Sequence, residues 1–372
     1  MLSPLIFECA RPVPDPGRVR RLAAAVDDWD AVLSHAESHG MAPLLYWHLR
    51  GETVPAAAAA RLRDRFLRNA HRNLRFGSEL LRLVAALETA GISVLAFKGP
   101  VTAWTLYENP ALREMSDVDI LVPPADGRRA CRLLLSEGCV SNYPGADWRM
   151  FRWLSETSLS RGGVPIDLHW AALPRFLRFA DPGAGAWTRS REAPVAGGSV
   201  RTLSPEDLLL YLAVHGAKHC WTSVNWLADW ARLAARPEID WDLVAARARA
   251  SRISRTLSLA LALIDELLDC PPPVELPGDP AATALAQQVS RELRAGSGWP
   301  HGAGQQIRFA TALAETVPAK GLMWWSIVQP TLAEHAWMRL PRLLFPLYYV
   351  ARPLRLLAKY AARLTSAPPA SP

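Results

Sequence analysis

Two aspartates that are two residues apart stand in a short apolar stretch, Asp-Val-Asp-Ile-Leu-Val, at residues 117–122. In a β-strand, residues i and i+2 point to the same face, so this spacing aims both carboxylates to one side. Adjacent carboxylates repel each other and are costly to bury unpaired, and a divalent cation removes that penalty. Mg²⁺ prefers carboxylate oxygens and keeps water and substrate phosphates as its other ligands. The spacing therefore predicts a Mg²⁺ (or Mn²⁺) site at Asp117 and Asp119.

A third carboxylate, Asp167, belongs to a later apolar stretch, Ile-Asp-Leu-His, at residues 166–169. If the two stretches form neighbouring strands, three carboxylates converge. That is the minimum for one or two metal ions that bridge the phosphates of a nucleotide and an incoming nucleophile. His169 shares the face of Asp167, and it is either a partner of the carboxylates or a packed histidine.

Lys98 and Gly99 follow another short apolar stretch, at a point where a helix is expected to begin. A glycine there lets the backbone approach a phosphate, the N-terminus of a helix favours an anion, and Lys98 adds a cation. Pro100 removes one N–H donor from the same turn. The pattern predicts a phosphate-binding turn at Lys98 and Gly99.

The segments that must position these residues alternate between strand and helix. Short apolar runs are bounded by turn residues, and amphipathic segments lie between them. We expect strands at 93–97 and 117–122, helices at 101–108 and 128–137, and a hairpin of 156–160 and 164–169 across Gly162 and Gly163. Residues 92–170 are therefore expected to form a small α/β module.

Helical patterns dominate on both sides of this module. Apolar residues recur at helical spacing from about residue 27 to residue 90, and Gly91 ends the pattern. Further helices are expected at 208–233, 241–250, 254–268 and 281–294. The fold class is therefore α+β and helix-rich, with a small mixed sheet flanked by N- and C-terminal helical regions. We divide the chain into a helical region (1–90), a mixed-sheet domain (91–200), a helical domain (201–295) and a C-terminal extension with a basic apolar tail (296–372).

These elements resemble the nucleotidyltransferase superfamily, whose palm domain is like that of DNA polymerase β. More specifically, the chain is similar to a large bacterial family of nucleotidyltransferases, some found beside genes for peptide natural products and polysaccharides. The resemblance covers roughly residues 27–270. It is carried by Lys98-Gly99 after a strand, Tyr107, Arg113, the strand with Asp117 and Asp119, Ile166 to Trp170, His215 to His219, and Trp226 to Asp229.

The resemblance implies transfer of a nucleoside monophosphate from a nucleoside triphosphate to an unknown acceptor, which is a small molecule, a peptide or a protein. It also implies that residues 91–200 form the palm and that Mg²⁺ or Mn²⁺ is the cofactor. Asp117 and Asp119 would bind the metal, and Asp167 would help to bind it and activate the acceptor. The nucleotide would be held by Lys98, Gly99, Arg113, His215 and Lys218. Many relatives have Gly-Ser at the position of Gly99-Pro100, and that serine touches the triphosphate.

Three residues of one expected helix have two interpretations each. His215, Lys218 or His219 either lines a cleft and contacts base or phosphate, or belongs to a polar helix face. His215 and His219 have the i, i+4 spacing of zinc ligands. Gly216 takes the place of the glutamate in HExxH, which argues against zinc.

The sequence also leaves open the role of Arg113 and the activity itself. Arg113 could pair with Asp117 or Glu114 as well as hold a phosphate. The protein could be a catalytically inactive accessory of a biosynthetic cluster that binds nucleotide or a peptide. A test for pyrophosphate release separates this interpretation from nucleotidyl transfer.

The positive charge is concentrated near the C-terminus. The chain has 42 basic and 35 acidic residues, and Met338–Arg363 contains six basic residues and no acidic one. The rest of the protein carries 7 − 6 = +1, which argues against a nucleic-acid partner. Five scattered cysteines without a CxxC pair indicate neither a disulfide framework nor a structural zinc site.

The sequence shows no signal peptide pattern and no apolar run long enough to span a membrane, so we expect a cytoplasmic location. The C-terminal tail is apolar, interrupted by proline and flanked by arginines. One interpretation is a weak contact with an anionic membrane surface, with the protein as a scaffold there. The other, which we favour from the sequence, is a terminal helix docked on the body with its arginines exposed.

Overall fold

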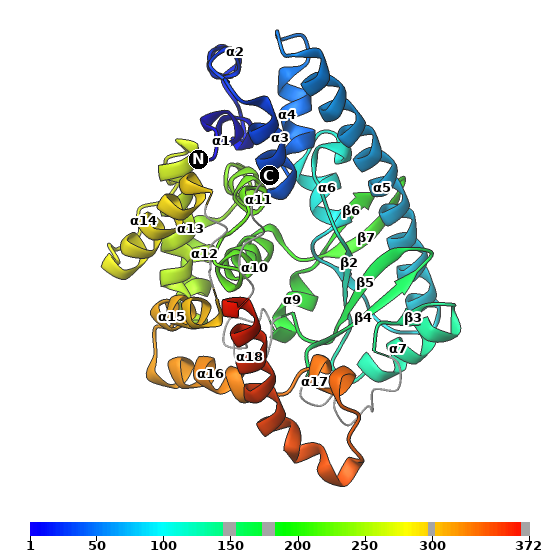
Figure 1. Ribbon diagram of the computed structural model, residues 1–372. Helices are drawn as coiled ribbons and strands as arrows, with labels where there is room; N and C mark the ends of the chain where they lie inside the picture. Colours follow the sequence, from blue (N-terminus) through cyan, green and yellow to red (C-terminus); the bar gives the residue numbers. More distant parts are fainter. Residues whose placement is uncertain (144–153, 173–182, 297–301, 366–372) are drawn as a thin grey trace.

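The computed structural model describes residues 1–143, 154–172, 183–296 and 302–365. Helices dominate, and a five-stranded sheet and a two-stranded sheet lie among them (Figure 1). The α+β, helix-rich fold class is therefore confirmed. The strands are β1 (Leu95–Ala96), β2 (Val118–Leu121), β3 (Val140–Ser141), β4 (Glu156–Arg161), β5 (Val164–His169), β6 (Arg191–Val195) and β7 (Gly198–Thr202).

One set of helices lies before the five-stranded sheet in the chain or connects its first strands. They are α1 (Pro4–Ala10), α2 (Pro16–Ala24), α3 (Trp29–Ser38), α4 (Ala42–Leu49), α5 (Ala56–Thr89), α6 (Pro100–Leu106), the 3-10 helix η1 (Pro110–Leu112) and α7 (Gly127–Ser136). Helix α5 has 34 residues and is therefore about 51 Å long. It ends just before Gly91, whose φ of +69° suits a glycine after a helix, as the sequence predicted.

The five-stranded sheet has the order β1-β2-β5-β4-β3 and is mixed. Strand β5 runs parallel to β2 and antiparallel to β4, and the predicted hairpin turn at Gly162 and Gly163 joins β4 to β5. In the pairing of β2 with β5, Asp119 lies opposite Asp167. Because paired residues on neighbouring strands point to the same face, this register places the two carboxylates side by side.

The two faces of this sheet differ in character. Val118, Ile120, Ile166 and Leu168 are buried in one cluster with side chains of α5 and α7. Asp119 and its partner on β5 alternate with these residues and therefore point to the opposite face. Helices α5 and α7 cover the apolar face of the sheet. The acidic residues lie on the other face, toward the helical region that follows.

The helices after the sheet form that region and the C-terminal part. They are α9 (Gly183–Arg189), α10 (Pro205–Lys218), α11 (Val224–Ala234), α12 (Trp241–Ala250), α13 (Ser254–Leu268), α14 (Pro280–Ala295), α15 (Ala303–Leu313), α16 (Val317–Val328), α17 (Leu332–Trp337), the 3-10 helix η3 (Arg342–Leu347) and α18 (Tyr348–Thr365). Helices α1–α4 and α10–α14 share one buried apolar cluster, so the start of the chain packs against this later region.

The prediction of one continuous helix over 208–233 is wrong. Helices α10 and α11 are separated by a turn in which Cys220 and Trp221 have φ values of +55° and +51°. The backbone N–H of Trp221 returns to the Gly216 carbonyl at 2.7 Å. A Cβ on Gly216 would lie 2.6 Å from the Trp221 ring, so this glycine makes room for the buried indole.

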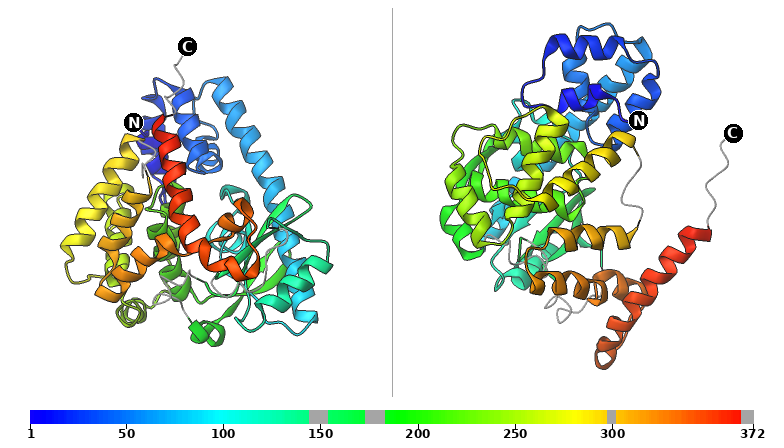
Figure 2. Two further views of the ribbon diagram at one scale, coloured as in Figure 1. Left: turned by 60° about the horizontal axis from the view of Figure 1, so that its bottom comes forward. Right: turned by 90° about the vertical axis from the view of Figure 1, so that its left-hand side faces the viewer.

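The C-terminal helix does not dock as the sequence interpretation expected. Helix α18 packs against α16, α17 and η3, and in the right-hand view of Figure 2 its C-terminal end stands apart from the rest of the molecule. Tyr348 and Ala351 are buried, but Leu354 and Leu357 are 57% and 67% exposed. In the part of the chain that the structure describes, no helix is both long and apolar enough to cross a membrane.

Candidate active site

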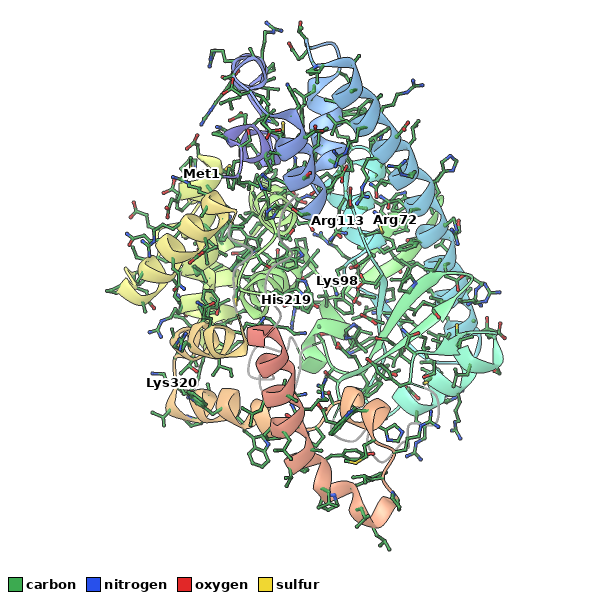
Figure 3. All side chains as sticks on the ribbon, in the orientation of Figure 1. Met1, Arg72, Lys98, Arg113, His219 and Lys320 are labelled. Carbon is green, nitrogen blue, oxygen red and sulfur yellow. The ribbon has the colours of Figure 1, made fainter. Side chains whose placement is uncertain are left out.

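A cavity of about 570 Å³ opens between the acidic face of the sheet and helices α10 and α11. Lys98, Asp117 and Asp167 line it from the sheet side, and Lys218 and His219 line it from the end of α10. Figure 3 labels Lys98 and His219, which approach this space from the two sides. The fold therefore brings residues from three distant parts of the sequence to one cavity.

Asp119 lies at the centre of a buried network of charges beside this cavity. Its Oδ1 lies 2.7 Å from Lys98 Nζ and 3.1 Å from His169 Nε2. The other ring nitrogen of His169, Nδ1, lies 3.0 Å from Oε2 of Glu156. Oδ2 of Asp119 is buried and has no hydrogen-bond partner among the described residues. A buried carboxylate oxygen without a partner is costly, so this network leaves one position for a ligand.

Asp167 stands next to this network. It is half-buried and accepts a hydrogen bond from Ser158 Oγ at 2.7 Å. One ligand atom each of Asp119, Asp167 and His169 lies within 4.8 Å of the others. Asp117 lines the same cavity just before β2, although it is outside this close group of described residues. His169, whose role the sequence left open, contacts two carboxylates and is thus their partner.

The protonation states follow from these contacts. Burial raises the pKa of Asp117 to about 6, and the negative charge of Asp119 adds to the shift. Burial works to raise the pKa of Asp119 as well, but Lys98 and His169 outweigh it and hold that pKa below its usual value. Burial opposes the charge on His169, and its contacts with Asp119 and Glu156 nevertheless raise its pKa to about 9. At neutral pH, Lys98 and His169 are therefore both cations.

The donor set fits a divalent cation that prefers oxygen ligands. Asp117 and Asp167 line the cavity, and the unpartnered Oδ2 of Asp119 is a buried oxygen beside it. The like charge of Asp119 contributes to the raised pKa of Asp117, and a bound cation would relieve this repulsion. Both ring nitrogens of His169 already contact carboxylates. An oxygen-rich set of this kind suits Mg²⁺ or Mn²⁺.

Gly99 makes the sharp turn between β1 and α6. Its φ is +59°, and a Cβ at this position would lie 2.7 Å from the carbonyl oxygen of Asp117. Only a glycine accommodates both the conformation and this close approach. Helix α6 then begins at Pro100, which offers no N–H. The turn thus supports the residues around Asp117 by close backbone packing.

We expect Gly99→Ala to lower the free energy of unfolding by about 1–3 kcal/mol, because the new Cβ strains φ and pushes on the Asp117 carbonyl. Chemical denaturation measures this loss. Gly278→Ala is the matched control, since nothing lies within 4 Å of a Cβ there. Equal stability of the two variants would contradict the account of this turn.

Arg113 is engaged in a buried ion pair. Its Nε and Nη2 lie 2.9 Å and 2.8 Å from Oδ2 of Asp229 on α11. Tyr107 donates its hydroxyl proton to the same carboxylate at 2.7 Å, and Arg113 Nη1 donates to the Gly99 carbonyl at 3.4 Å. The guanidinium side chain is only 8% exposed. Arg113 also lines the cavity, and its ion-pair partner lies far along the chain rather than among its acidic neighbours in sequence.

Helix α10 supplies the opposite wall of the cavity. Lys218 lines it, and no ion pair of Lys218 is found among the described residues, whereas Lys98 is held by Asp119. Burial lowers the pKa of Lys218, and the negative charge of Glu156 opposes this shift. An ammonium group in such a place lacks a close counter-ion. It is therefore suited to an anionic group of a ligand.

Two histidines of the same wall are neutral at physiological pH. Burial lowers the pKa of His215 well below its usual value, with Lys98 contributing. Burial and the charge of Lys218 lower the pKa of His219 to about 4. Both rings contact Trp226, with centroid separations of 5.6 Å and 5.2 Å. A neutral aromatic wall of this kind suits a nucleobase better than a phosphate.

Sequence reasoning missed Glu156 and Ser158, which contact His169 and Asp167. A signal for them exists in the predicted hairpin. Once its turn is fixed, the register of β4 with β5 pairs Glu156 with His169 and Ser158 with Asp167. Polar residues at every second position of β4 would then be expected on the acidic face. The partner of Arg113 had no such local signal.

A comparison with protein-family models agrees with this geometry. A model described as an uncharacterised nucleotidyltransferase matches residues 26–269, which are 244 of the 372 residues. The matched range includes the carboxylates, both lysines of the cavity and the buried ion pair of Arg113. No curated protein and no solved structure matches the chain.

Proposed function

Since the chain belongs to the family of uncharacterised nucleotidyltransferases, we propose that it transfers a nucleoside monophosphate from a nucleoside triphosphate to an acceptor. The observation that carries this proposal is the register of β2 and β5, which sets the buried Asp119 beside Asp167, a residue that lines the cavity. Lys218 supplies a cation on the facing wall. Acidic groups for a metal and a cation for phosphates are the two requirements of this chemistry.

In the proposed reaction, a hydroxyl or amine of the acceptor attacks the α-phosphorus of the nucleoside triphosphate. The new bond joins the acceptor to the α-phosphorus, the bond from this phosphorus to the bridging oxygen of the β-phosphate breaks, and pyrophosphate leaves. Asp167 orients the nucleophile and accepts its proton. Ser158 holds one oxygen of Asp167 by donating a hydrogen bond, which leaves the other oxygen for the acceptor.

Asp117, Asp119 and Asp167 would hold Mg²⁺ or Mn²⁺, which when bound offsets the negative charge on the phosphates. Lys98 keeps Asp119 ionised and in place, and His169 does so from the other side. We therefore assign Lys98 and His169 as positioning residues of Asp119. Gly99 supports the same strand ends through its contact with the Asp117 backbone.

The nucleoside triphosphate would lie between the sheet and α10. Lys218 is the cation that we assign to its phosphates, because it lacks an ion pair in the described part of the chain. His215, His219 and Trp226 form the neutral wall that we assign to the base. Arg113 acts indirectly, by fixing α11 to the turn at Gly99.

The decisive experiment is a screen of the four nucleoside triphosphates with Mg²⁺ and with Mn²⁺. Pyrophosphate release, and transfer of an α-phosphate label to the protein itself or to added small acceptors, are measured. We expect release with at least one triphosphate and its loss on chelation of the metal. Binding of a triphosphate without release under any acceptor would instead support an inactive accessory protein that binds nucleotide.

Metal binding can be tested without turnover. We expect Mn²⁺ to raise the melting temperature, since a ligand at about 100 times its Kd stabilises the folded state by about 2.7 kcal/mol. Asp119→Asn should abolish this shift, because it removes a buried carboxylate charge. Asp27→Asn, which changes an exposed carboxylate, should keep it. A native protein that shows no shift with either Mg²⁺ or Mn²⁺ would count against the metal site.

A further inference from the structure

Large apolar side chains are exposed mainly in the C-terminal part of the chain. Of the eighteen large hydrophobic residues that are exposed among those described, twelve lie between residues 317 and 357. We call them the C-terminal apolar surface: Val317, Leu322, Trp324, Trp325, Trp337, Met338, Leu343, Leu344, Leu347, Val350, Leu354 and Leu357. Apart from Met338, which directly follows α17, they come from α16, α17, η3 and α18, and α18 contacts each of the other three elements. The concentration in one small region marks it as a contact surface.

Helix α18 presents its apolar side to solvent. Val350, Leu354 and Leu357 follow one another at helical spacings of four and three, so they share one face, and they are 59%, 57% and 67% exposed. A helix on the surface of a water-soluble protein is expected to turn such a stripe inward. In α18 the opposite face is turned inward, as the next contacts show.

The inward face of α18 is held by a buried carboxylate. Glu334 on α17 is 0% exposed, and its oxygens lie 2.6 Å from Arg355 Nε and 3.4 Å from Arg352 Nη1. The Tyr348 hydroxyl donates to the Met338 carbonyl at 2.7 Å. These contacts hold α18 in a rotation that leaves the stripe of Val350, Leu354 and Leu357 exposed.

The charge of this region indicates what covers the stripe. Residues 338–363 include six basic residues and no acidic one in the sequence, and Arg352 and Arg355 pair with Glu334. Two copies meeting through this surface would oppose like charges. An anionic phospholipid surface accepts basic residues, leucines and tryptophans together, because tryptophan favours the boundary between lipid and water.

We propose that the C-terminal apolar surface binds the surface of an anionic phospholipid bilayer, with α18 lying in the interface and its leucine stripe among the lipids. No described helix is fit to span a bilayer, which agrees with binding at the surface. The surface lies outside residues 26–269, so it is additional to the part that the family model matches. The proposal does not depend on the nucleotidyltransferase activity.

Co-sedimentation of the full chain with vesicles tests this proposal. The vesicles contain phosphatidylcholine with phosphatidylglycerol, or phosphatidylcholine alone. We expect binding to the anionic vesicles, weaker binding to the neutral ones, and weakening by high salt. Leu354→Glu combined with Leu357→Glu should lower the partition coefficient by at least about tenfold, because two apolar side chains no longer enter the lipid.

Leu74→Glu is the matched control, since Leu74 on α5 is 56% exposed and lies outside the C-terminal apolar surface. It should bind vesicles as the native chain does. Far-UV circular dichroism should show that both variants keep the native helix content, because the changed side chains are exposed. No binding to anionic vesicles, or equal binding by the double variant, overturns the proposal. So does self-association without vesicle binding that the double variant loses, which would assign the surface to a second copy.

Discussion

Asp167→Asn is expected to lower the rate of nucleotide transfer by about 10²–10⁴-fold, the range found for removal of a positioned acid or base. The amide keeps the shape of the side chain and can still accept the hydrogen bond from Ser158. It can neither accept the proton of the acceptor nor supply negative charge to a metal. The measurement is initial pyrophosphate release with the triphosphate that the screen identifies.

The same variant should remain folded, which separates loss of chemistry from loss of structure. Asp167 is half-buried and, in the described residues, forms no ion pair, so its neutralisation strands no cation. Asp27→Asn controls for the loss of one carboxylate and should retain the native rate. A native rate for Asp167→Asn with an unchanged melting temperature would rule out the assigned role of this residue.

The second large effect concerns stability. Arg113→Met is expected to lower the free energy of unfolding by about 3–5 kcal/mol, since it leaves the buried carboxylate of Asp229 without its cation. Urea denaturation measures the change. The double variant Arg113→Met with Asp229→Asn removes both charges and still offers an acceptor to Tyr107. It should therefore recover a large part of the loss.

An exposed ion pair provides the comparison for this prediction. Arg20 is 69% exposed and lies 2.9 Å from Glu52, so Arg20→Met should cost no more than about 1 kcal/mol. If Arg113→Met lowered the free energy of unfolding no more than Arg20→Met does and yet abolished substrate binding, Arg113 would be a nucleotide contact. That result would support the nucleotide-binding role that the sequence resemblance implied for Arg113.

The parts of the fold that the sequence predicted are those with a local cause. The hairpin around Gly162 and Gly163 and the end of α5 before Gly91 both depend on glycines at positive φ. The aspartates of β2 and β5 lie on one face because alternation along each strand is fixed by the backbone. Their meeting needed only the further condition that the strands be neighbours, and the structure has them as neighbours.

The parts that the sequence did not predict have causes distant in the chain. Arg113 and Asp229 are 116 residues apart, and nothing near either one names the other. The break after α10 depends on Trp221, whose ring lies against Gly216, so the need for a turn arises from tertiary packing. In α18, the sequence interpretation of a docked helix places the leucines on the buried face. Instead, the buried Glu334 of α17 pairs with Arg355 on the opposite face of α18, and that face is turned inward.

The pairing of β5 with β2 also constrains how this chain can change in length. Successive residues of β5 point to opposite sides of the sheet, so inserting or deleting a single residue within β5, between Val164 and Asp167, would send the Asp167 side chain to the side of Ile166 and Leu168, beneath α5 and α7. Unless a bulge absorbs the change, only even-numbered insertions preserve the parity of the strand. Functional variants of β5 itself are therefore expected to differ from it in length by steps of two residues.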